Sequence, residues 1–152
     1  MNENLNNNGA KKFSLKPNLL LFWLRAKYEV NAKMLVGQYP NVILGIIPFG
    51  KQQISQPLKT VSSVMTNTKL YFKKFLIGLV LLILMFSTLN TDFSTVTIIL
   101  GIWGALILLN SYQSTFIIVN NGGQRTGYRF SFLDYGTVKR LAAEVNNHIA
   151  EL

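Results

Sequence analysis

Few residues in this chain combine a chemically active type with a suitable spacing. The stretch Gly45–Gln52 (GIIPFGKQ) nearly matches the phosphate-binding loop pattern G-x-x-x-x-G-K-S/T. Gln52, however, replaces the hydroxyl side chain that would bind Mg²⁺. Ile54, Pro57 and Leu58 then follow where a helix N-terminus should receive the phosphate. We therefore reject nucleotide binding at this stretch.

The groups that usually carry catalysis are isolated from one another in the sequence. His148 is the only histidine, cysteine is absent, and the six acidic residues form no close pair. Metal sites and acid–base pairs need several such groups together. Ser62, Ser63 and Thr137 have no activating base nearby in the sequence. The sequence thus predicts no catalytic residue, no metal and no cofactor, and we do not expect an enzyme.

The elements that would position any site are dominated by an apolar region in the middle of the chain. Phe75–Leu89 and Phe93–Leu109 carry no charge, and the polar stretch Asn90–Asp92 separates them. As helices they extend about 22 and about 25 Å, short of the roughly 30 Å hydrocarbon core. Lys73 and Lys74 can reach back to the interface and lengthen the first segment. Because neither segment has a polar face, we predict a transmembrane helical hairpin rather than two buried helices of a soluble protein.

The basic residues lie outside this apolar region. The formal net charge is +9, and the lysines and arginines occur in ones and twos rather than in the clusters typical of nucleic-acid binding. Those nearest the two spans are Lys69, Lys73, Lys74, Arg125 and Arg129. The positive-inside rule then predicts a two-pass protein with both termini cytoplasmic. The same residues, extended by Lys51 and Lys59, could also attract anionic phospholipids, and both interpretations stay open.

Small residues in the apolar region suggest where the helices touch. Gly101 and Ala105 form a small-xxx-small pair, which permits a close approach of another helix. We expect this pair to pack against the face of the first helix that carries Gly78. A contact between copies in a homo-oligomer is the alternative.

Two polar arms flank the hairpin, which we assign to residues 69–111. Residues 1–18 are Asn-rich and basic and are expected to be disordered. Residues 19–68 are expected to form the first half of a cytoplasmic domain, with three or four short strands after Ala26. The run Leu19–Leu24 is too short to span a membrane, so it either lies in the membrane interface or packs on the domain.

The second arm, residues 112–152, is expected to complete that domain. Thr115–Val119 and Thr126–Phe132 flank the turn sequence NNGG, which predicts a pair of antiparallel strands. A helix from about Tyr135 to Leu152 follows, because apolar residues recur there at helical spacing: Val138, Leu141, Val145, Ile149 and Leu152.

Several of these stretches together resemble a known family. Ile47–Lys51 and Pro57–Val64, followed by Phe116–Val119, the NNGG turn and the terminal helix, are similar to the bacterial pleckstrin-homology-like (PH-like) membrane proteins. The resemblance covers roughly Ala26–Leu152 and departs from the family's commoner layout, in which the spans precede the domain. It implies an α+β membrane protein with a PH-like bent β-sheet, capped by a C-terminal helix and interrupted by the two-helix transmembrane hairpin.

The resemblance also implies a function. Such proteins act as non-catalytic protein- or lipid-binding modules, and some accompany bacteriocin operons, which implies self-protection (immunity) against a membrane-active peptide. The expected location is the bacterial cell membrane, and the expected partners are the bilayer, its anionic phospholipids and a membrane-active peptide or membrane complex. Two alternatives are a holin-like pore-forming protein and an accessory subunit of a transport or secretion complex.

Overall fold

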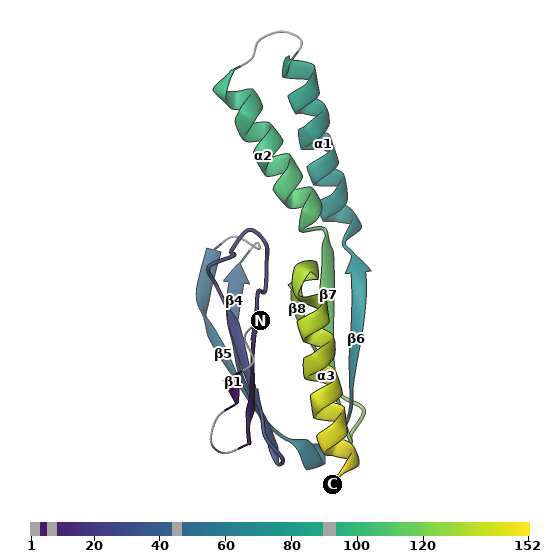
Figure 1. Cartoon of the computed structure of the whole chain (residues 1–152). Helices are drawn as coiled ribbons and strands as arrows, with labels where there is room; N and C mark the ends of the chain where they lie inside the picture. Colours follow the sequence, from purple (N-terminus) through teal and green to yellow (C-terminus); the bar gives the residue numbers. More distant parts are fainter. Residues whose placement is uncertain (1–3, 6–8, 44–46, 90–93) are drawn as a thin grey trace. The chain divides into compact units, whose positions relative to one another are not determined.

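The computed structural model of this chain describes residues 4–5, 9–43, 47–89 and 94–152. The chain forms two compact units (Figure 1). Unit 1 combines Met1–Thr68 with Ser114–Leu152, and unit 2 is Lys69–Gln113. Unit 1 therefore draws on both polar arms, and unit 2 contains the apolar region.

The first sheet of unit 1 is five-stranded and antiparallel, in the order β1-β2-β3-β4-β5. Its strands are β1 (Asn4–Leu5), β2 (Lys11–Leu15), β3 (Ala26–Val30), β4 (Met34–Ile43) and β5 (Ile47–Pro57). β2 and β3 alternate apolar and polar residues, so Phe13 and its cross-strand partner Tyr28 are both buried while Lys12 and Lys27 are exposed. This alternation gives the sheet one core face and one polar face.

The second sheet has three strands, β6 (Val61–Leu70), β7 (Tyr112–Asn120) and β8 (Arg125–Ser131). The 3₁₀ turn η1 (Leu58–Thr60) leads from β5 into β6. The Asn121 N–H donates to the Thr60 carbonyl at 3.0 Å, and the Tyr71 N–H donates to the Ser111 carbonyl at 2.8 Å. The start of β6 therefore lies beside the end of β7, and the two strands run antiparallel although the helical hairpin separates them in the sequence.

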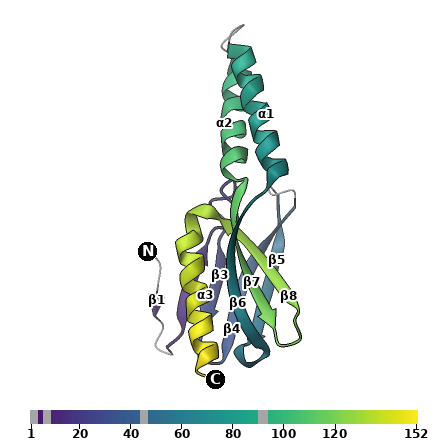
Figure 2. The same cartoon turned by 90° about the vertical axis from the view of Figure 1, so that its right-hand side faces the viewer.

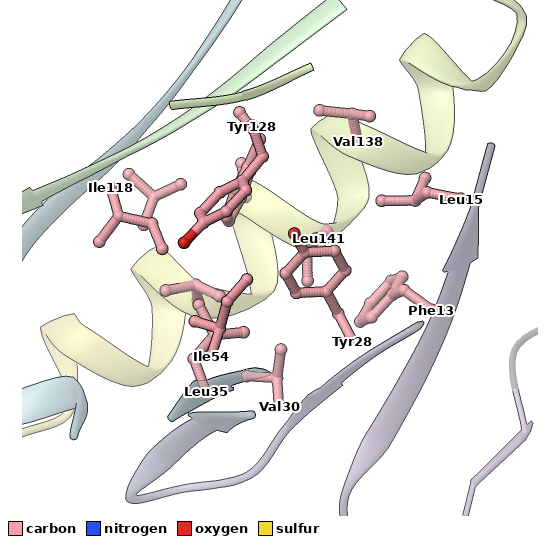
Figure 3. Packing of buried hydrophobic residues seen from close by; sticks show 14 of the residues in the cluster. Phe13, Leu15, Tyr28, Val30, Leu35, Ile54, Ile118, Tyr128, Val138 and Leu141 are labelled. Atoms are coloured by element: carbon pink, nitrogen blue, oxygen red, sulfur yellow. The ribbon is translucent and has the colours of Figure 1, made fainter. Parts of the chain in front are cut away.

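A short 3₁₀ turn, η2 (Phe132–Asp134), and the helix α3 (Tyr135–Ala150) close unit 1. α3 packs against β2, β3 and β8. Val138, Leu141 and Val145 are fully buried, whereas Leu152 at the end of the expected stripe is exposed. Figure 3 shows the resulting core between the sheets and the helix, with contributions from both arms: Tyr28, Leu35, Ile54, Ile118, Tyr128, Val138 and Leu141.

The two ends of unit 1 can be defined from strand pairing. At the far end, Val30 pairs with Leu35, Met34 pairs with Pro57, and Asn121 contacts Thr60. The hairpin end is the opposite one, where β6 leads out to the helical hairpin and β7 leads back. Strand register places the pairs Leu15–Ala26 and Pro40–Lys51 toward this end.

Unit 2 contains two helices, α1 (Phe72–Leu89) and α2 (Thr95–Leu109), which pack against each other. The expected polar connection Asn90–Asp92 lies outside the described residues. The Ser111 hydroxyl donates to the Leu108 carbonyl at 2.6 Å and helps to end α2.

The expected fold class, a PH-like bent sheet capped by a helix and interrupted by a two-helix transmembrane hairpin, is wrong. The described strands form two separate sheets, because η1 redirects the chain and β6 pairs with β7 rather than with β5. Of the described helices, only α1 is long and apolar enough to cross a membrane. α2 has fifteen residues, or about 22 Å, and falls short of that length.

The expectation that residues 1–18 are disordered is also wrong for part of the segment. Lys11–Leu15 forms β2, with Phe13 and Leu15 in the core. The Lys11 ammonium forms an ion pair with Glu144 of α3 at 2.7 Å. The apolar residues of this short strand are buried only because β3 and α3 arrive from elsewhere in the chain, which the local composition does not reveal.

Candidate membrane-anchoring site

Most of the apolar side chains of α1 are exposed, and the others are only partly buried. Gly78 is its only buried residue, while Phe72, Ile83 and Phe86 are each exposed to about 60%. Its eighteen residues extend about 27 Å, close to the thickness of a hydrocarbon core. Exposed apolar patches of this size mark interaction or membrane sites. α1 is therefore a candidate membrane span by length and composition.

α1 and α2 touch through glycines. A Cβ atom at Gly78 would lie 2.8 Å from the Leu108 nitrogen and 3.0 Å from the Gly104 carbonyl oxygen. Gly101 faces the Met85 sulfur. At Gly78, a side chain would collide with the backbone of α2, so glycine allows this close approach.

Of the expected contact pair Gly101–Ala105, the structure places Gly101 against the first helix. Ala105 is exposed, and Gly104 takes its place against the first helix, packed on Leu81 and Leu82. Gly101 and Gly104 are three residues apart and share one helix face. That spacing was a signal in the sequence that could have identified Gly104.

A hydroxyl network joins the two helices near their connection. The Thr97 hydroxyl, whose residue is 1% exposed, donates to the Thr88 hydroxyl at 3.2 Å. The Thr88 hydroxyl donates to the Met85 carbonyl at 2.8 Å, and the Ser94 hydroxyl lies 3.3 Å from that of Thr97. Hydroxyl bonds of this kind hold apolar helices together where water is absent. Sequence reasoning did not identify these three residues.

Lys73 and Lys74 lie in the first turn of α1, and Lys69 lies on β6 just before it. The first turn of α1 holds no acidic residue. Cations at a helix N-terminus oppose the helix dipole, so these lysines do not stabilise α1 itself. The Lys74 ammonium lies 5.7 Å from the centre of the Tyr71 ring. The three lysines lie at the start of an apolar helix, which is the position that lysines take at a membrane boundary.

Arg125 and Arg129 lie on β8 of unit 1, whereas Lys69, Lys73 and Lys74 belong to unit 2. Arg125 begins β8 at the far end of unit 1, immediately after the turn that contacts Thr60. Arg129 lies farther along β8, and its carbonyl accepts a hydrogen bond from the Tyr39 hydroxyl at 2.8 Å. β8 runs from Arg125 at the far end of unit 1 toward its hairpin end, so Arg129 lies nearer to the hairpin end than Arg125 does.

The stretch that resembles a phosphate-binding loop has a different backbone. Residues 44–46 lie outside the described residues, and Ile47–Pro57 is the strand β5. Gly50 has a φ of 81°, which glycine adopts without strain. Lys51 therefore sits in a strand that pairs with β4 and not before a helix N-terminus.

His148 has carboxylates on its own helix as neighbours. Its Nε2 lies 3.3 Å from Glu144, which also binds Lys11, and its Nδ1 lies 3.6 Å from Glu151. Across the described part of the chain, no group of three or more His, Cys, Asp and Glu residues could hold a metal ion. The contacts of His148 thus stay within α3, and the Glu144 carboxylate links α3 to β2 through Lys11.

No protein-family model, no curated protein and no solved structure matches this chain. The resemblance to the PH-like membrane proteins therefore stays an expectation from the residues that carry it.

Proposed function

We propose that this protein is a non-catalytic binding module held at a bacterial cell membrane by its apolar helices, with both termini in the cytoplasm. The observation that carries the proposal is α1, an eighteen-residue apolar helix with one buried residue. Leaving that surface in water would cost about 25 cal/mol for each Å² of apolar area. A bilayer removes that cost.

The shared core of unit 1 supports a location of both arms on one side of the membrane. β6 comes from the first arm and pairs with β7 of the second, and Tyr28 contacts Phe116 and Phe130 across the core. Strands cannot pair across a bilayer. In the two-pass form of this localisation, the expected connection Asn90–Asp92 faces the outside.

Introduced cysteines test this topology, because the chain has none of its own. Ala32→Cys reports on the first arm and Asn121→Cys on the second, and both positions are exposed. We expect an impermeant thiol reagent to label both only after the cells are permeabilised, and to label Thr91→Cys in intact cells. Labelling of the two arms from opposite sides, or release of the protein by an alkaline carbonate wash, would overturn the proposal.

The lysines at the start of α1 support binding of anionic lipid headgroups. Each lysine near such a surface contributes about 1 kcal/mol. Replacing Lys73 and Lys74 by Gln should therefore reduce the preference for anionic over zwitterionic vesicles by about 2 kcal/mol, or roughly 30-fold.

The double variant Lys59→Gln/Arg125→Gln is the matched control for this measurement. It removes the same charge at the far end of unit 1, so its preference for anionic vesicles should stay near that of the unmodified chain. Equal losses in the two variants would show a general charge effect and contradict a local headgroup site.

Self-protection against a membrane-active bacteriocin stays a prediction from the family resemblance. Its test is the survival of a sensitive bacterium that expresses the chain during challenge with such a peptide. Dye leakage on expression alone would favour the holin-like alternative, and a constant set of co-purified membrane proteins would favour the accessory-subunit alternative.

A further inference from the structure

Large exposed apolar side chains in unit 1 gather at its hairpin end. Five of them, each 56–69% exposed, define what we call the apolar rim: Phe22, Trp23, Ile47, Phe49 and Leu133. Surface apolar residues are normal when scattered, but a group of them marks a contact site.

Strand pairing assigns the first four rim residues to this end. Phe22 and Trp23 lie in the loop that joins β2 to β3, beyond the pair Leu15–Ala26. Ile47 and Phe49 begin β5, beyond the pair Pro40–Lys51. In both overall views, this loop and the outer ends of β4 and β5 lie at the end of unit 1 toward which β6 runs (Figures 1 and 2).

Leu133 reaches the same end through η2. The Ser131 N–H donates to the Lys16 carbonyl at 2.8 Å, and the Lys16 N–H donates to the Asp134 carboxylate at 2.6 Å. These bonds hold η2 beside the loop that carries Phe22 and Trp23.

The far end of unit 1 has the opposite character. Among the described residues, three of its turns are Asn31–Lys33, Lys59–Thr60 and Asn121–Gln124, and none of these three carries a large apolar side chain. The other large exposed apolar residues in the described part of unit 1 are Val36 and Met65 on strands and Leu152 at the C-terminus. The hairpin end is thus the one suited to an apolar surrounding.

The fold holds the rim aromatics outward. Leu21 is buried at 2% exposure and accepts the Leu24 N–H at 2.9 Å, while the Asn18 side chain accepts the Leu20 N–H at 3.0 Å. Phe22 and Trp23 then meet edge to face, with ring centres 5.1 Å apart. The run Leu19–Leu24 therefore both packs on the domain, through Leu21, and presents two rings to the surroundings.

The charges near the rim suit a lipid surface. Arg25 and Lys51 flank it and are exposed. Asp134, the acidic residue among the described loops of this end, has its carboxylate bonded to the Lys16 N–H. Aromatic rings with nearby basic side chains are typical of segments that lie among anionic headgroups.

We propose that the apolar rim is a second membrane contact, which inserts into the headgroup region and seats unit 1 on the lipid surface. The chain leaves for α1 and returns from α2 at this end of unit 1, so the rim lies at the same end of unit 1 as the two connections to the anchor. This inference rests on the proposed function, because the helical hairpin brings the protein to a bilayer.

The two tryptophans allow the rim contact and the membrane anchor to be tested separately. Trp23 belongs to the rim, and Trp103 lies on α2 with 42% exposure. Trp103→Phe leaves Trp23 as the reporter, and Trp23→Phe leaves Trp103. The full chain is reconstituted in anionic vesicles whose lipids carry a quencher either near the headgroup or deep in the acyl chains. We expect the shallow quencher to act on Trp23 and the deep quencher to act on Trp103.

Each result decides between the two proposals. Quenching of Trp103 without quenching of Trp23 overturns the rim contact and leaves the anchor standing. Because α2 packs against α1, insertion of α1 carries Trp103 into the bilayer. Quenching of neither tryptophan therefore overturns both proposals, and quenching of Trp23 alone keeps the rim and overturns the anchor. In the Trp103→Phe background, Ile47→Ser with Phe49→Ser should lower the quenching of Trp23. Met65→Ser, on a strand away from the rim, should leave it unchanged.

Discussion

The Tyr28 hydroxyl is buried in the core and has no hydrogen-bond partner among the described residues. Its ring packs on Phe116, Tyr128 and Phe130, with centres 5.9–6.3 Å away. Gly37 leaves the room for it, since a Cβ there would lie 2.7 Å from the ring. An unsatisfied buried hydroxyl costs about 1–3 kcal/mol.

Tyr28→Phe should therefore keep or raise the free energy of unfolding, by up to about 1 kcal/mol, in denaturant titrations of the full chain in detergent. Tyr39→Phe is the matched control, because the Tyr39 hydroxyl donates to the Arg129 carbonyl. That control should lose about 1 kcal/mol. Similar losses in both variants would contradict the account of Tyr28.

The same tyrosine predicts a response to alkaline pH. Burial raises the pKa of Tyr28 above its ordinary value of about 10, and nearby Tyr128 and Tyr39 raise it further. Above about pH 10 the unfolded chain releases a proton that the folded chain retains, so the free energy of unfolding falls as pH rises. Denaturant titrations at about pH 9 and about pH 11 should show a smaller fall for Tyr28→Phe than for the unmodified chain. An equal fall in the free energy of unfolding of the two chains would rule out Tyr28 as a cause of the pH dependence.

At the level of elements, α3 protects the edge of the second sheet. The Asn146 side chain accepts the Val64 N–H and donates to the Val64 carbonyl, both at 2.9 Å. β6 is an edge strand, so these backbone groups have no partner strand on that side. Asn146→Leu should cost about 1–3 kcal/mol of unfolding free energy and promote association of copies. Asn147→Leu, at an exposed neighbouring position, should do neither, and light scattering with denaturant titration compares the two.

The contact between α1 and α2 depends on Gly78. Because a Cβ there would meet backbone atoms of α2, Gly78→Ala should weaken the helix pair by about 1–3 kcal/mol. Gly136→Ala, in open space at the start of α3, should be neutral or stabilising by up to about 1 kcal/mol. The difference is measured by unfolding in detergent. A disulfide between cysteines introduced into the two helices reports whether the helices are still paired. A stable pair in Gly78→Ala would show that the helices meet elsewhere.

At the level of the molecule, unit 1 and unit 2 should be separable. β6 and β7 are neighbours, so an Asn-Gly turn can replace residues 69–113 and join them directly. We expect this shortened chain to keep the β-rich circular dichroism and cooperative unfolding of unit 1 and to leave the membrane fraction. Loss of cooperative unfolding would mean that unit 1 needs the helices to fold, and a shortened chain still firmly bound to membranes would contradict the anchor.

The sequence was sufficient for features that local pattern encodes. The uncharged run of α1, the lysines before it and the alternation around the NNGG turn can be recognised because composition and periodicity act over a few neighbouring residues. Other features depended on partners distant in the chain. Phe13 and Leu15 are buried only through β3 and α3, Gly104 rather than Ala105 meets Gly78, and Arg125 lies at the far end. These features follow from strand register and helix rotation. Long-range packing determines both, so the local periodicity of the sequence does not predict them.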